Sequence, residues 1–95
     1  MTITRINEFR AADGKTDALG VFLRSVIELV ARSPGCRDCV LLVDPEDASR
    51  LAIIETWDSI ASHRAAAANI PAEKIAEVRP LLAEPPRGRY YEAIE

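Results

Sequence analysis

Two neighbouring apolar runs, residues 36–44 and 50–57, restrict the fold of this chain more than any other feature of its sequence. Within the first run Val40 and Leu42 alternate with Leu41, so positions of both parities are apolar, and LAII in the second run repeats the pattern. Successive side chains of a β-strand point to opposite faces, so a sheet built from these runs is apolar on both faces. Each face therefore needs a covering layer.

The rest of the chain carries local signals for further elements. The polar segment PEDAS between the two runs is typical of a hairpin connection, and ADGK near the N-terminus is typical of a turn. Apolar residues recur at helical spacing in DALGVFLRSVIELVAR, and SIASHRAAAA has high helix propensity. The segment NIPAEK interrupts the helical pattern, and its Pro71 suits the first position of a new helix. Further on, Pro80 predicts a kink or a helix end. The expected elements are strands over 2–11, 36–44, 50–57 and 88–94, a helix over 17–32 and a helical region from Asp58.

The order strand, helix, strand, strand, helix, strand predicts a ferredoxin-like α+β sandwich. Its four strands form one antiparallel sheet, and both helical regions cover the same face. The other apolar face is covered most simply by the sheet of an identical subunit, so we expect a homodimer that pairs through the sheet face. The 95 residues are expected to form one domain over 1–95, because a second core would not fit.

Charge and hydropathy exclude several classes of partner. The chain has 12 Lys and Arg against 15 Asp and Glu, a net charge of −3, whereas non-specific nucleic-acid binding needs a strongly basic surface. No apolar run approaches the roughly 20 residues of a membrane span. The N-terminal MTITRINEFR lacks the basic and apolar regions of a signal peptide. We therefore expect a cytoplasmic protein that binds neither nucleic acid nor membranes.

The two cysteines, Cys36 and Cys39, form a C-x-x-C at the start of a predicted strand. Side chains three residues apart on a regular strand point to opposite faces, and a zinc site would need two more ligands than the sequence supplies nearby. Redox pairs usually lie where a strand leads into a helix, and here a helix leads into a strand. We expect two reduced thiols with structural roles.

Several motifs together resemble one known family. They are the Pro-Gly-Cys before the second strand, the Asp-Pro hairpin, the acid-x-Trp of ETW, the histidine of the following helix and the aromatic strand GRYYEAI. This combination, which covers nearly the whole chain, resembles the antibiotic biosynthesis monooxygenase (ABM) family of dimeric α+β barrel proteins. The family includes cofactor-independent oxygenases of phenolic polyketides, quinol oxygenases and haem-degrading oxygenases.

The resemblance implies a site between sheet and helices. In the family's polyketide oxygenases an asparagine and a tryptophan help to activate substrate and oxygen, and Asn7 matches that asparagine in place and type. The haem-degrading branch uses Asn, Trp and His, but its tryptophan lies within the helix. Here Trp57 ends a strand, and His63 follows only six residues later. We therefore expect neither haem nor another cofactor, and no metal.

The expected chemistry needs no cofactor, because a deprotonated phenol or quinol can itself donate an electron to O2. His63 titrates near neutral pH and is the candidate base. Asn7 and the indole N–H of Trp57 are candidate hydrogen-bond donors to the resulting anion. Glu55 shares strand parity with Trp57 and is expected to be semi-buried beside an arginine, with a role as base the weaker alternative. The candidate substrate-binding residues are Phe9, Phe22, Arg64, Tyr90 and Tyr91, with alternation placing one of the tyrosines toward the helices.

Each of these residues also has a purely structural interpretation, as core, rim or interface packing. Two function classes therefore remain: a monooxygenase that combines a small aromatic molecule with O2, and a non-catalytic or isomerase-type dimer that binds a small molecule. An enclosed cavity lined by Asn7, Trp57 and His63 would favour the first class. A space filled by Phe9, Phe22 and Trp57 would favour the second. The sequence does not specify the substrate.

Overall fold

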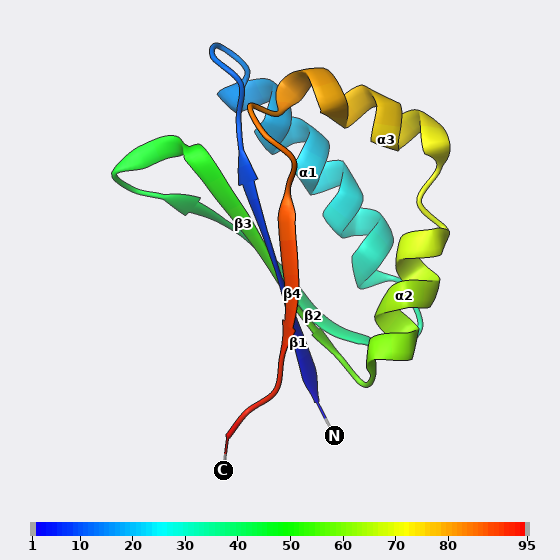
Figure 1. The fold of residues 1–95 in the computed structure, drawn as a ribbon. Helices are drawn as coiled ribbons and strands as arrows, with labels where there is room; N and C mark the ends of the chain where they lie inside the picture. The colour runs from blue at the N-terminus through cyan, green and yellow to red at the C-terminus, as the bar shows by residue number, and fades with distance from the viewer. Residues whose placement is uncertain (1, 95) are drawn as a thin grey trace.

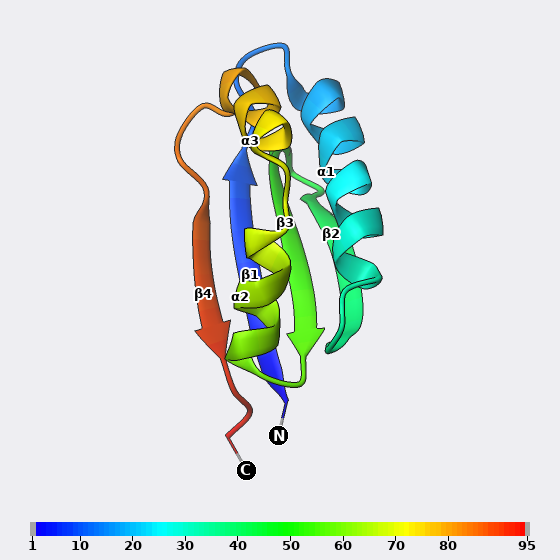
Figure 2. The same ribbon diagram turned by 90° about the vertical axis from the view of Figure 1, so that its right-hand side faces the viewer.

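The computed structural model describes residues 2–94 and confirms the ferredoxin-like fold. Four antiparallel strands form one sheet in the order β2-β3-β1-β4, and the helices all lie on one face of it (Figure 1). In Figure 2 α1 covers the β2 side of this face, and α2 lies over β1 and β3. The elements are β1 (Ile3–Arg10), α1 (Thr16–Ala31), β2 (Cys36–Asp44), β3 (Asp47–Trp57), α2 (Ile60–Ala68), α3 (Ala72–Val78), a 3-10 turn (Arg79–Leu81) and β4 (Arg87–Tyr91).

Several boundaries differ from the sequence prediction. The hairpin between β2 and β3 is shorter than PEDAS, because β3 already begins at Asp47, opposite Asp44. Pro71 precedes α3 in an extended conformation, with φ −59° and ψ 142°, rather than occupying its first turn. β4 ends at Tyr91, three residues before the predicted end at residue 94. Pro80 lies in the 3-10 turn that ends this helical region, as its missing N–H predicts.

The core lies between the sheet and the helices. Leu19 and Leu23 of α1 are completely buried against Ile53 of β3, and Trp57 at the end of β3 is equally buried in a second cluster with Val30. Full burial of side chains of this size stabilises the fold by about 1.5–3 kcal/mol each. Trp57 is thereby held rigidly next to α2, whose first turn is capped by Ser59.

The opposite face of the sheet is uncovered in the single chain. The register pairs Ile6 with Ile54 and Ile54 with Val40, while Leu42 lies opposite Ala52, so one apolar band crosses three strands. Val40 and Leu42 are 41% and 44% exposed. The two-faced apolar pattern of the sequence is thus confirmed, with helices on one face only (Figure 1). Within residues 2–94 no helix is both long and apolar enough to cross a membrane.

Candidate functional site

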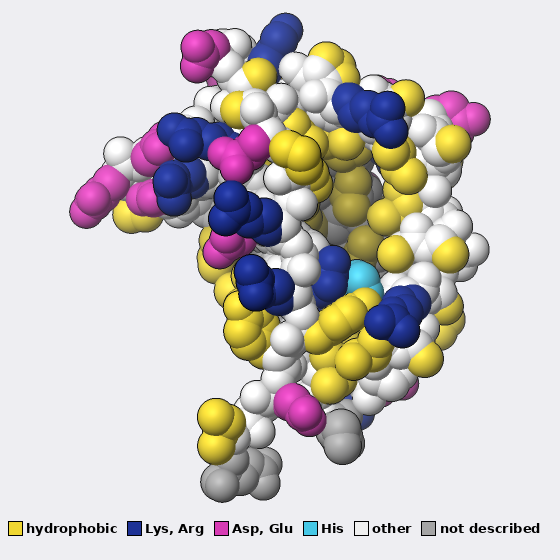
Figure 3. Space-filling model, viewed as in Figure 1, with side chains coloured by type: hydrophobic (Ala, Val, Ile, Leu, Met, Phe, Trp, Pro, Cys, Tyr) yellow, Lys and Arg dark blue, Asp and Glu magenta, His cyan; other side chains and the backbone are white. Residues whose placement is uncertain are grey.

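A pocket of about 250 Å³ lies between the sheet and the helices, and it opens to the surface as a hollow with the histidine at its lower edge (Figure 3). Most of its wall is apolar, with Phe9 from β1, Phe22 and Val26 from α1, and Val78 from α3. The cavity exists because these side chains line it rather than fill it. Asn7, Trp57 and His63 line this pocket together with Phe9 and Phe22, and the pocket is open to the surface rather than enclosed.

Glu55 is the centre of the polar part of this pocket. It lies on β3 facing the helices, with only 4% of its surface exposed. The indole N–H of Trp57 donates to its Oε1 at 2.8 Å, and the amide of Asn7 donates to its Oε2 at 3.2 Å. A buried carboxylate needs such donors, because an unpaired charge in an apolar environment is costly. The sequence-predicted donors Asn7 and Trp57 are therefore engaged by Glu55.

His63 reaches the same carboxylate from α2. Its Nε2 lies 3.8 Å from Oε1 of Glu55, a longer distance than a hydrogen bond, and its Nδ1 lies 2.6 Å from the hydroxyl of Tyr90. A carboxylate only accepts, so the favoured neutral tautomer carries its proton on Nε2 toward Glu55 and accepts the Tyr90 O–H at Nδ1. The imidazole also stands edge-on to both Trp57 and Tyr90, with ring centroids 5.5 and 5.2 Å apart.

Arg5 supplies the positive charge of the cluster. Its Nε donates to Oδ1 of Asn7 at 3.1 Å, and its guanidinium lies 4.6 Å from the centre of the Tyr90 ring. The side chains of Arg5 and Asn7 pass over Gly88 of β4, where a Cβ atom would come within 2.5 Å of Oδ1 of Asn7. A side chain at this position would push the Arg5 guanidinium and the Asn7 amide aside, so glycine leaves room for the cluster.

Burial and neighbouring charges bring the pKa values of Glu55 and His63 closer together. Desolvation raises the pKa of Glu55 above its usual range, against hydrogen bonds from Trp57 and Asn7 and the charge of Arg5. Desolvation also lowers the pKa of His63, with the charges of Arg5 and Arg64 acting in the same direction. Opposed shifts of this kind in one pocket mark candidate acid–base sites.

The comparisons with known proteins agree with the fold. The family model described as "Antibiotic biosynthesis monooxygenase" matches residues 2–78. The chain belongs to the antibiotic biosynthesis monooxygenase family. No curated protein sequence matches this ABM domain significantly.

Several solved structures share the fold of this ABM domain. Rv0793 from Mycobacterium tuberculosis superimposes with a TM-score of 0.87 at 20% identity, over 100% of this chain and 97% of that one. SnoaB from Streptomyces nogalater, described as a cofactor-independent oxygenase, gives a TM-score of 0.84 at 20% identity, over 99% and 94% of the two chains. SO0527 from Shewanella oneidensis gives 0.80 at 26% identity, over 95% and 88%.

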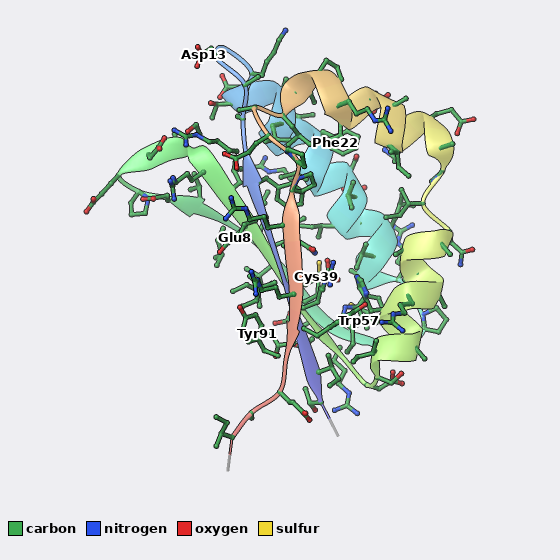
Figure 4. All side chains as sticks on the ribbon, viewed as in Figure 1. Glu8, Asp13, Phe22, Cys39, Trp57 and Tyr91 are labelled. Atoms are coloured by element: carbon green, nitrogen blue, oxygen red, sulfur yellow. The ribbon has the colours of Figure 1, made fainter. Side chains whose placement is uncertain are left out.

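Some of the remaining predicted site residues belong to the pocket of this ABM domain, and others lie outside it. Phe9 and Phe22 line the pocket, and Tyr90 supports His63 from β4. Tyr91 pairs with Thr4 and lies on the opposite face of the sheet, away from Trp57 (Figure 4). Arg64 is exposed outside the pocket, with its guanidinium 5.9 Å from the centre of the Tyr90 ring. Alternation along β4 thus gives one tyrosine to each face, as predicted.

For three residues of this site the structure gives contacts that the sequence did not predict. Glu55 was expected beside an arginine, but its hydrogen bonds come from Trp57 and Asn7, with Arg5 one step further away. Its parity with Trp57 was the one sequence signal for burial. Gly88 and Arg5 had no such signal, because their roles depend on the pairing of β1 with β4.

The C-x-x-C expectation was wrong in its geometry. A register shift between Cys36 and Asp38 inserts an extra residue, so Cys36 pairs with Trp57 and Cys39 with Glu55. Both thiols consequently face the helices and pack against the buried Trp57 cluster. Both are unbridged, and burial, together with the charge of Glu55, raises the pKa of Cys39 to about 12. Such thiols stay protonated, which agrees with a structural role.

A second hollow lies away from the site just described. It is larger, about 550 Å³, and lies near the β2–β3 hairpin and the segment before β4. Charges of both signs line it, among them Glu8, Arg10, Arg50 and Arg87, and the acid–base cluster is not part of it. Within residues 2–94 no group of three or more His, Cys, Asp or Glu side chains is placed to hold a metal ion.

Proposed function

We propose that this ABM domain is a cofactor-independent monooxygenase that oxidises a small phenol, quinol or polyketide-like aromatic with O2. The observation that carries the proposal is the buried carboxylate of Glu55, held by Trp57 and Asn7 beside the neutral imidazole of His63 in a mostly apolar cavity. Family membership supports it, as does the fold shared with SnoaB, a protein described as a cofactor-independent oxygenase.

Proton transfer to Glu55 begins the proposed reaction. Its raised pKa makes the buried carboxylate a stronger base than an exposed one, so it takes the proton of the substrate hydroxyl. Tyr90 holds the imidazole of His63, which presents a neutral N–H beside the developing charge. Arg5, the cation nearest to this cluster, stabilises the substrate anion.

Oxygen then enters without an external reductant. The substrate anion donates one electron to O2, the two radicals combine at the ring carbon to be oxidised, and the peroxide takes back the proton from Glu55. Loss of water from this hydroperoxide leaves a carbonyl group on the ring. One oxygen atom ends in the product and the other in water, and the two hydrogens of that water come from the substrate. The protein positions the substrate, moves one proton and excludes bulk water.

A non-catalytic or isomerase-type function is the second candidate. It is favoured by one observation: within residues 2–94 every buried polar side-chain atom already has a hydrogen-bond partner in the chain. A cluster that satisfies itself can serve to fix the pocket wall around a ligand that is merely bound, or rearranged without oxygen. The two candidates differ in whether O2 is consumed.

We also propose that the apolar band on the uncovered sheet face pairs with the same band of a second copy. Its centre is apolar, at Val40, Leu42 and Ile54, and charged side chains such as Glu8 and Arg89 lie toward its edge. An apolar centre within a charged rim is the usual composition of a homodimer interface. A two-fold axis brings identical bands together, so no other partner is required. The pocket, on the other face, stays open.

Oxygen uptake by the metal-free protein, measured across a panel of hydroquinones and anthrones, tests the proposal. We expect uptake with at least one compound, formation of the carbonyl product, and a loss of at least tenfold in Glu55→Gln and His63→Ala. Glu8→Gln is the matched control, because Glu8 is an exposed carboxylate on the other face of β1. Uptake that survives Glu55→Gln unchanged refutes the assigned site, and absence of uptake on every compound favours the second candidate.

A further inference from the structure

We infer that the pocket is specific for aromatic molecules that carry an anionic group, with Lys74 as the residue that binds it. The inference deepens the proposed function by naming the substrate class of the same site. Lys74 belongs to α3 and lines the pocket. The Glu55 cluster lines another part of the same pocket, with Glu55 itself on β3. Figure 4 shows the two regions: Phe22, the neighbour of Lys74, points in from α1 near α3, and Trp57 lies near α2.

The surroundings of Lys74 leave its charge available to a ligand. Its Nζ donates to the hydroxyl of Ser25 at 2.9 Å and lies 5.4 Å from the centre of the Phe22 ring. None of the three ion pairs among residues 2–94 includes Lys74. A half-buried ammonium normally approaches a carboxylate, because burial without an opposite charge is costly. Here the neighbours of the ammonium are one hydroxyl, that of Ser25, and the face of the Phe22 ring.

The charges of the pocket also favour an anion. Its ionisable side chains are Arg5, Lys74, Glu55 and His63, of which Arg5 lies next to Glu55 through Asn7. His63 is neutral at pH 7, since its pKa lies below the usual value. One positive charge, that of Lys74, therefore has no counterpart in the wall. A bound anion would supply it where the low dielectric makes an ion pair stronger than in water.

Size and shape narrow the ligand further. A volume of about 250 Å³ is below the roughly 300–1,000 Å³ of pockets for drug-sized ligands, which suits one or two fused rings. Apolar side chains such as Val26, Ile53 and Val78 form the wall between the two polar regions. The ligand class is thus a flat aromatic acid, with the hydroxyl to be deprotonated at one end and a carboxylate at the other.

A structural role for Lys74 is the competing interpretation, because its bond to Ser25 ties α3 to α1 across the pocket. Loss of a tether loosens the pocket for every ligand, whereas loss of an anion site weakens anionic ligands alone. Two ligands of similar shape, kept from reacting by the exclusion of O2, separate the cases: 6-hydroxy-2-naphthoate, which is anionic at pH 7, and 2-naphthol, which is neutral. Binding is measured by titration calorimetry on the full chain, with circular dichroism to confirm that each variant is folded.

We expect the wild-type protein to bind the naphthoate about tenfold more tightly than 2-naphthol. Lys74→Met, which keeps the length of the stem, is expected to remove this preference, while Lys74→Arg and Ser25→Ala retain it. Binding of neither compound, equal weakening of both by Lys74→Met, or a preference that survives Lys74→Met overturns the inference. A carboxylate preference without any oxygen uptake would instead contradict the proposed monooxygenase, so the two failures are distinguishable.

Discussion

Replacement of Trp57 by phenylalanine tests whether the buried hydrogen bond to Glu55 holds the site together. The substitution keeps an aromatic ring in the core but removes the N–H that donates to Oε1 of Glu55 at 2.8 Å. A hydrogen bond to a charged group contributes about 1.5–3 kcal/mol. For a domain of this size, a loss of about 1.5–3 kcal/mol lowers Tm by about 6–24 °C.

The smaller ring also leaves a cavity, so the hydrogen bond must be separated from the loss of packing. A double-mutant cycle of Trp57→Phe, Glu55→Leu and the double variant does this, since the cavity cost is common to both backgrounds. Urea denaturation is followed by far-UV circular dichroism rather than fluorescence, because Trp57 is the only tryptophan and the variant loses its emission. All variants are measured at one protein concentration. We expect a coupling free energy of about 1.5–3 kcal/mol.

The same variant makes a prediction for pH. The folded pKa of Glu55 lies above its value in the unfolded chain, so stability falls as pH rises from the unfolded value through the folded one. The bond from Trp57 is the largest effect that holds this pKa down. Trp57→Phe should therefore cost more stability at pH 7 than at pH 4, because the bond from Trp57 favours the ionised form of the carboxylate. A coupling free energy below about 0.5 kcal/mol, or equal costs at both pH values, refutes this account of the site.

Three further predictions concern the pocket and the sheet face. Gly88→Ala should lower stability by about 1–3 kcal/mol in urea denaturation, because the new methyl group displaces Asn7. Oxygen uptake should fall as pH drops through the raised pKa of Glu55, with a midpoint above the ordinary value of 4.5, while His63 remains neutral at pH 7. Leu42→Asp should convert the proposed dimer into a monomer in sedimentation velocity, since it places a charge in the centre of the apolar band.

Controls from the same chain make these results interpretable. Gly20 lies inside α1, and a methyl group there would meet no other part of the fold. Gly20→Ala should therefore stabilise the protein by about 0.5–1 kcal/mol, whereas Gly88→Ala destabilises it. Val21 of α1 is 69% exposed, and Val21→Asp should leave the oligomeric state unchanged. A midpoint for oxygen uptake at or below pH 4.5, or a dimer that survives Leu42→Asp, contradicts the corresponding prediction.

Local periodicity was sufficient for the order of the elements and for the side of the sheet on which most residues lie. The even spacing of Asn7 and Phe9 placed both on one face of β1, and both line the pocket. The shared parity of Glu55 and Trp57 likewise predicted a semi-buried Glu55, and the structure buries this carboxylate more deeply than predicted, beside Trp57. Such inferences succeed because the direction of a side chain along a regular strand depends only on neighbouring residues.

The same reasoning failed at Cys36 and Cys39, where the strand is not regular. The extra residue between them exists because β2 pairs with β3 in a particular register, and pairing is a property of two distant segments. As a consequence, both thiols lie on the face of the sheet that packs against the helices, next to Trp57. The sequence of β2 alone gives no signal of this.

What the sequence by itself determined is the fold: alternation, helical spacing and two apolar runs prescribe one sheet with helices on one face, since these signals act between residues close in the chain. The tertiary structure alone decided the site. The carboxylate of Glu55 meets groups from β1, β3 and α2, and Tyr90 of β4 contacts the imidazole of His63, so the cluster spans residues 5–90 of the chain. Its acid–base character follows from burial, and burial of a charge is set by everything packed around it.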